Sequence, residues 1–188
     1  MDVQELHRSW QYFLSIEKDL DETTRYIEPV GQSNTYSFEF YKIITLGCSE
    51  IEAAFKMICK VIDVNSTCGN MGEYKKMILT QYPKICAAEV RVPRWGGKTI
   101  RPFENWDKDR LKWWDSHQDV KHSRFESIQS ATYENAVYTL AGLYILLLYL
   151  YKITGNECPY GVSKCFFSEY CYAPLFCNRP SELPDFSE

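Results

Sequence analysis

Residues 41–62, YKIITLGCSEIEAAFKMICKVI, carry the pattern that decides the fold. Apolar side chains recur there at alternating steps of three and four residues, as expected for a helix that buries one face along its whole length. These positions are Tyr41, Ile44, Cys48, Ile51, Phe55, Ile58 and Ile62. Charged residues occupy the other faces. The stretch therefore predicts a long helix that lies along the core of a helical bundle.

A second stretch, from Thr132 to Thr154, is apolar on almost every side and has Gly155 as a stop signal. Its apolar run covers the 16 residues 136–151, fewer than the roughly 20 that a membrane-spanning helix needs. Five tyrosines between residues 133 and 151 also suit a protein core better than lipid. We expect this helix to pack antiparallel to residues 41–62 at the centre of a soluble protein that has no membrane partner.

The rest of the chain supplies smaller elements. Residues 3–27 have helical periodicity, and residues 72–82 form a shorter helix that ends at Pro83. Two short β-prone runs flank Trp95-Gly96-Gly97. The expected fold is all-α: an up-and-down bundle of four or more helices with a small hairpin-like excursion near 89–103. We assign residues 1–154 to this bundle and residues 155–188 to a cysteine-rich C-terminal extension.

Composition narrows the class of protein. The chain has 188 residues, of which 45% are hydrophobic and 15% aromatic, so it is long and apolar enough for one well-packed domain. Its net charge of -4 disfavours a general polyanion-binding protein, although this charge is compatible with a local basic patch. The first residues, Met1 to Glu5, lack the basic and apolar regions of a secretory signal. We therefore expect a cytoplasmic protein with reduced cysteines.

Eight cysteines raise the question of disulfides or metal. Cys48 and Cys59 fall within a helical pattern, where they serve as small buried hydrophobes. Four more lie near the C-terminus: Cys158, Cys165, Cys171 and Cys177. They are separated by six, five and five residues, whereas zinc ribbons and knuckles usually offer closer pairs. We expect no metal and no cofactor, with a structural zinc site as the alternative for this cluster.

The segment Trp113 to Arg124, WWDSHQDVKHSR, holds two of the three histidines. In a continuous helix the spacing would place one cationic and aromatic stripe on a single face. The members of that stripe are Arg110, Trp114, His117, Lys121 and Arg124. Asp115, Asp119 and His122 would share a neighbouring face, so that Asp119 could orient an imidazole.

This set has the minimum apparatus for cleaving RNA without a metal. His117 and His122 are the candidate groups for proton transfer, and Arg110 is the third candidate catalytic residue. Lys121 and Arg124 are candidates for binding the phosphate and stabilising its charge. The residues alone favour a structural role over a catalytic one. In that alternative the charged side chains pair with neighbours such as Glu50 or Glu52, and the tryptophans belong to the core.

Residues 36–154 resemble the HEPN superfamily, in particular small uncharacterised bacterial members with a Trp-Trp…Lys-His-x-Arg segment. The resemblance rests on helix order and on three stretches: Ser49 to Glu52, Trp113-Trp114 with Asp119 to Arg124, and Asn135 to Leu143. It implies an all-α bundle that is usually dimeric. Many members of the superfamily are metal-independent ribonucleases of toxin–antitoxin, phage-defence and RNA-processing systems.

The superfamily signature is an arginine followed by a polar residue, with four to six residues between the arginine and a histidine. Arg110 and His117 fit the spacing, but Leu111 stands where asparagine, aspartate or histidine is expected. The resemblance therefore leaves two expectations. One is an RNA-directed endoribonuclease of a toxin or phage-defence system, with an antitoxin among its partners. The other is a noncatalytic interaction or regulatory module that binds a nucleotide, RNA or a protein; both would form a homodimer.

Overall fold

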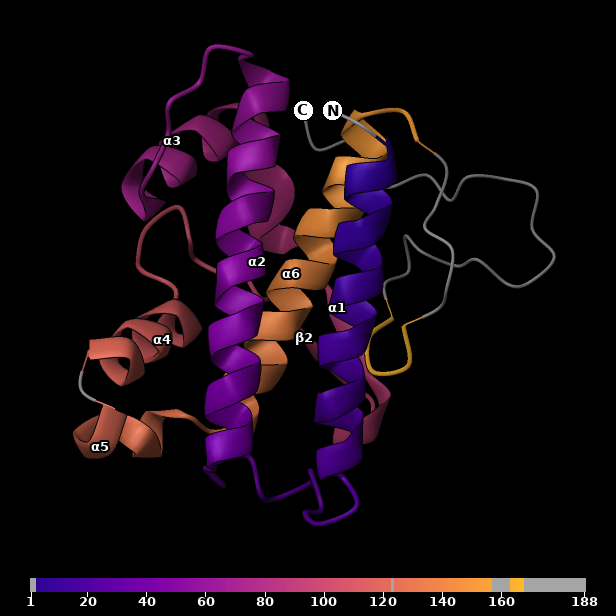
Figure 1. Cartoon of the computed structure of the whole chain (residues 1–188), viewed down its shortest axis with the longest axis vertical. Coiled ribbons are helices and arrows are strands. Elements are labelled where there is room, and N and C mark those ends of the chain that lie inside the picture. The colour runs from indigo at the N-terminus through magenta and orange to yellow at the C-terminus, as the bar shows by residue number, and fades with distance from the viewer. Residues whose placement is uncertain (1–2, 123, 157–162, 168–188) are drawn as a thin grey trace, which may run out of the picture.

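The computed structural model describes residues 3–122, 124–156 and 163–167. Three long helices lie side by side in Figure 1: α1 (Val3–Thr23), α2 (Phe38–Ile62) and α6 (Tyr133–Ile153). The only sheet in these ranges has two short strands. The all-α bundle predicted from the sequence is confirmed.

Helix α6 is the core of the bundle. Of its 21 residues, 16 are buried, because α1, α2 and α4 pack against different faces of it. The helix is long and apolar enough to cross a membrane, but 83% of its apolar window is enclosed by other parts of the chain. Its burial therefore fits the central helix of the bundle.

Helix α2 buries the face that the heptad spacing indicated. Ile44, Cys48, Ile51, Phe55 and Ile58 are buried along its length. Further buried residues widen this stripe: Phe40, Ile43, Gly47, Ala54 and Cys59. The extra width arises because α2 contacts α1 and α6 on one side and α3 and α4 on the other.

The relative direction of α2 and α6 differs from our expectation. Phe40 contacts Tyr133 near the start of both helices, and Gly47 faces Thr139 further along both. The two helices are therefore parallel, not antiparallel, and Figure 1 shows both running the same way. The reason is the long connection of residues 63–132, which returns to the start of α2 and places the Tyr133 N–H 2.8 Å from the Thr35 carbonyl oxygen.

The long connection carries the smaller elements. It begins with α3 (Met71–Gln81) and the 3-10 turn η1 (Pro83–Ala87), and it ends with α4 (Lys112–His122), α5 (Arg124–Ser127) and η3 (Ile128–Ser130). Between them lies the predicted hairpin. Its strands β1 (Val90–Val92) and β2 (Lys98–Ile100) are antiparallel and are joined through η2 (Pro93–Trp95). Gly96 and Gly97 have φ values of 63° and 72°, which glycine adopts without a steric penalty.

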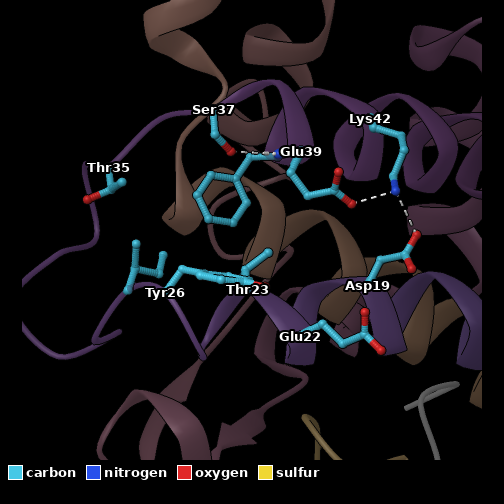
Figure 2. Close-up of a pocket in the computed structure, with 10 residues that line it drawn as sticks. Asp19, Glu22, Thr23, Tyr26, Thr35, Ser37, Glu39 and Lys42 are labelled. Carbon is cyan, nitrogen blue, oxygen red and sulfur yellow. Dashed lines mark hydrogen bonds and ion pairs between the residues drawn. The ribbon is translucent and has the colours of Figure 1, made fainter.

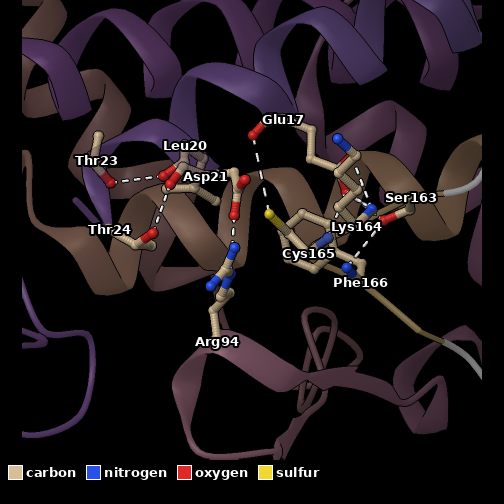
Figure 3. A network of polar contacts seen from close by, with 10 residues as sticks. All are labelled: Glu17, Leu20, Asp21, Thr23, Thr24, Arg94, Ser163, Lys164, Cys165 and Phe166. Atoms are coloured by element: carbon tan, nitrogen blue, oxygen red, sulfur yellow. Dashed lines mark hydrogen bonds and ion pairs between the residues drawn. The ribbon is translucent and has the colours of Figure 1, made fainter.

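Residues 163–167 contact α1 and β1, and Figure 3 shows Ser163 to Phe166 beside Glu17 of α1. The carboxylate of Glu17 on α1 accepts hydrogen bonds from the Ser163 hydroxyl and from the backbone N–H groups of Lys164 and Cys165. Phe167 exchanges two backbone hydrogen bonds with Arg91 of β1. Of the C-terminal cysteines, Cys165 is buried here. Cys158, Cys171 and Cys177 lie outside the described residues.

Candidate functional site

The helix that carries the predicted site starts later than the sequence analysis assumed. Residues 101–109 form successive turns, which the buried side chains of Phe103 and Trp106 hold against Phe55 of α2. Helix α4 therefore begins at Lys112, and Arg110 precedes it. The Arg110 guanidinium lies 2.6 Å from the Asp115 carboxylate, so its charge is already paired. The predicted stripe therefore does not extend to Arg110, whereas Trp114, His117 and Lys121 lie within α4.

The inner face of α4 is built around Trp113. Its ring packs on Gly142 of α6, and its indole N–H donates to the Pro102 carbonyl oxygen at 2.8 Å. His117 lies one helical turn further on the same side, so it is turned into the protein and is only 8% exposed. Its ring centroid lies 5.6 Å from that of Trp114. His117 is therefore a packed residue in this structure.

The outer face of α4 carries the remaining described candidates. Asp119 and Lys121 are exposed near the end of the helix. Arg124 does not continue α4: it begins α5, which corrects the expectation of one helix through residue 124. The side chains of His122 and Arg124 lie outside the described part of the structure. Their contact with Asp119, Lys121 or a phosphate therefore stays a prediction.

The structure also has a cleft that the sequence analysis did not predict. It lies between the C-terminal end of α1 and the N-terminal end of α2. It has a volume of about 470 Å³ and opens between the last turn of α1 and the first turn of α2. Its walls come from residues 19–27 and 35–42: Asp19, Glu22, Thr23, Tyr26, Ile27, Thr35, Ser37, Glu39, Phe40 and Lys42. In Figure 2, Asp19 and Glu22 lie along α1 and face Glu39 and Lys42 on α2. Only Phe40 among the lining residues is buried, so the cleft is open to solvent.

The cleft is acidic. Three carboxylates line it, and its single ammonium group, Lys42, lies 2.5 Å from Glu39 and 3.0 Å from Asp19. These two hydrogen bonds, to Glu39 first and then to Asp19, raise the pKa of Lys42 and keep it charged. The lining residues therefore have a net charge of -2, three carboxylates against one ammonium.

The geometry at the end of α1 explains where this charge comes from. The last turn of α1 has no basic residue, although the carbonyl end of a helix favours cations. Basic residues of other elements pair with two of the carboxylates near this end of α1. Lys42 of α2 lies 3.0 Å from Asp19, and Arg94 of η2 lies 3.0 Å from Asp21. Within the part of the chain that the structure describes, the ion pair of Glu22 is with the exposed Lys18, at 3.8 Å. This lack of basic residues in a terminal turn was the sequence signal for the negative charge of the site, although not for the cleft.

Among the described residues, no group of three histidine, cysteine or acidic side chains is arranged to hold a metal ion. Two of the three cleft carboxylates, Asp19 and Glu39, are paired with Lys42. No protein family, curated protein or solved structure matches this chain. The chemistry of the two sites is therefore the basis for the functional proposal.

Proposed function

We propose that this protein is a noncatalytic, HEPN-like interaction module of the cytoplasm that works as a homodimer and binds a protein partner. The observation that carries the proposal is the position of His117. A general acid or base must reach the proton that it transfers, and His117 is turned into the protein beside Trp114. Arg110, which would stabilise the phosphate, is already paired with Asp115.

A protein partner is favoured over RNA or a nucleotide because of charge. Binding to a phosphate backbone requires a basic surface, since its affinity comes largely from lysine and arginine contacts. The chain has a net charge of -4, and the cleft between α1 and α2 adds carboxylates where a phosphate would be repelled. Exposed aromatic side chains such as Tyr26 and Phe38 instead suit a protein interface.

One observation supports the second candidate, a metal-independent endoribonuclease of a toxin or phage-defence system with an antitoxin partner. Lys121 is exposed in the last turn of α4, next to His122 in the sequence and three residues before Arg124. A site at this junction of α4 and α5 would use His122 as the proton-transfer group, oriented by Asp119, and would not need His117. Two copies of the junction in a homodimer would supply the second histidine.

Incubation of the pure protein with mixed RNA in EDTA tests the proposal. We expect no cleavage above that of the His122→Ala variant. We also expect His117→Ala to lower the melting temperature, because it removes a mostly buried ring, at a cost of about 1–2 kcal/mol. Metal-independent cleavage that disappears in His122→Ala, while the variant keeps its melting temperature, would overturn the proposal in favour of the nuclease.

A further inference from the structure

From the cleft between α1 and α2 we infer a docking surface for a basic segment of a protein partner, one that places an arginine or lysine side chain beside Glu22. This inference rests on the proposed function, since it names the chemistry of the partner. Three features of the described residues carry it: the unbalanced charge of the lining, the open shape of the cleft, and the exposed aromatic ring of Tyr26.

Charge specifies the cation. Asp19 and Asp21 each have a basic partner from another element, in Lys42 and Arg94 respectively. Glu22 has a single, long contact with Lys18, whose own side chain is 75% exposed. A guanidinium or ammonium group that enters the cleft would meet Glu22 and also the carbonyl end of α1, two features that favour positive charge. An acidic segment would meet repulsion from both.

The aromatic side chains specify what accompanies the cation. Tyr26 lines the cleft and is 86% exposed, while Phe40 forms part of its floor and is buried. Apolar residues beside the cation would cover the Tyr26 ring, and a cation can also lie over the face of an aromatic ring. The segment of the partner that fits this cleft therefore has alternating basic and apolar residues.

The open shape distinguishes a protein segment from a small molecule. Sites for small ligands usually enclose about 70–90% of the ligand surface. This cleft does not do so, because nine of its ten lining residues are exposed or half-buried. A free polyamine would satisfy the carboxylates but would leave the Tyr26 ring in water. A peptide chain that crosses the cleft would cover that ring.

Amide chemical shifts of the full-length protein, measured by NMR during titration with short peptides, test the inference. The probe is a peptide of alternating leucine and arginine, and its matched control replaces each arginine by the neutral isostere citrulline. We expect the arginine peptide to shift amides of residues 19–27 and 35–42 in a saturable way, and the citrulline peptide to leave them unchanged. Spermidine alone should bind at least about tenfold more weakly than the arginine peptide, because it covers no aromatic ring.

Two variants test the residues named. Glu22→Gln should weaken binding of the arginine peptide about fivefold or more, and Tyr26→Ala should have an effect of similar size. Both side chains are surface-accessible, so the fold should persist. Glu52→Gln is the matched control, since Glu52 is an exposed carboxylate of α2 in an i,i+4 pair with Lys56. It should leave affinity unchanged.

Several outcomes would overturn the inference. They are shifts outside the cleft, equal binding of the citrulline peptide, equal binding of spermidine, or no loss of affinity in Glu22→Gln. The result is separable from that of the RNA assay. If the protein cleaves no RNA and its cleft does not bind the arginine peptide, the proposed function stands and the inferred docking surface is wrong. Cleavage of RNA would remove the proposed function whatever the cleft binds.

Discussion

Glu17 shows how one residue can join distant parts of the chain. It lies in the middle of α1, where a helical periodicity would place it near buried neighbours, yet it is a carboxylate with only 3% of its surface exposed. Its partners, Ser163 to Cys165, lie 146–148 residues away in the sequence. Burial raises the pKa of Glu17, while the hydrogen bonds from Ser163, Cys165 and Lys164 oppose that rise.

The raised pKa makes a prediction about pH. Between the ordinary value of 4.5 and the raised value, folded Glu17 binds a proton that the unfolded chain does not, so lower pH stabilises the fold through this group. We expect the free energy of unfolding of the wild type, minus that of Glu17→Gln, to increase as pH falls from 7 towards 4.5. Urea unfolding at several pH values measures it. A difference that is constant, or that shrinks on acidification, would contradict this account.

The Glu17→Ala variant measures how much the hydrogen bonds between Glu17 and residues 163–165 contribute to the free energy of unfolding. This change leaves the N–H groups of Lys164 and Cys165 without their acceptor, and an unsatisfied buried donor costs about 1–3 kcal/mol.

At the scale of single elements, the sequence predicted what depends on local periodicity. The spacing of Ile44, Cys48 and Ile51 fixed the buried face of α2, because that face is set by helix geometry alone. The start of α4 could not be predicted in the same way. It depends on Phe103 and Trp106, which pack against α2 and hold the preceding residues in turns. Because of these contacts between distant residues, Arg110 precedes the helix and does not share a helix face with His117.

The contact between α2 and α6 gives a prediction at the same scale. A Cβ atom added to Gly47 would lie 2.8 Å from Thr139 Cγ2 and 3.2 Å from Leu140 Cδ2. We expect Gly47→Ala to destabilise the protein by about 1–3 kcal/mol, in spite of the better helix propensity of alanine. Thr139→Ser removes the clashing methyl group, so the double variant should recover part of the loss.

Gly72→Ala is the matched control for this prediction. Gly72 lies in the first turn of α3, and an added Cβ would meet only the Asn70 side chain at 3.4 Å. Thermal unfolding should show no loss of stability in this variant. If Gly47→Ala were as stable as Gly72→Ala, the close approach of α2 to α6 would be wrong.

At the scale of the whole molecule, the sequence analysis was wrong about the direction of α6 relative to α2, which it predicted to be antiparallel. Either direction buries the same apolar faces, so periodicity cannot choose between them. The choice follows from the 63–132 connection, whose end is tied to the segment before α2 through Thr35 and Ser37. The cleft escaped prediction for a related reason: it is made by the ends of two helices, and neither end is a site by itself.

Three buried thiols report on the integrity of this assembly, because each lies in a different contact. Cys48 lies where α2 meets α6, Cys59 lies on α2 near the loop before α3, and Cys165 packs against α1. Burial raises the pKa of Cys59 to about 12 and raises the pKa of Cys48 and Cys165 far above the ordinary value. The thiolate is the reactive form, so all three should resist alkylation in the folded protein.

We therefore predict that iodoacetamide modifies the half-buried Cys68 and Cys86 faster than these three, and that all eight cysteines react in denaturant. Peptide mapping by mass spectrometry gives each rate. Cys48 and Cys59 require opening of the bundle, whereas Cys165 requires only release of residues 163–167 from Glu17 and Arg91, so Cys165 should be the least protected of the three. EDTA should leave the rates and the melting temperature unchanged. Faster labelling of Cys165 on chelation, with a lower melting temperature, would instead show that the C-terminal cysteines hold a structural metal ion.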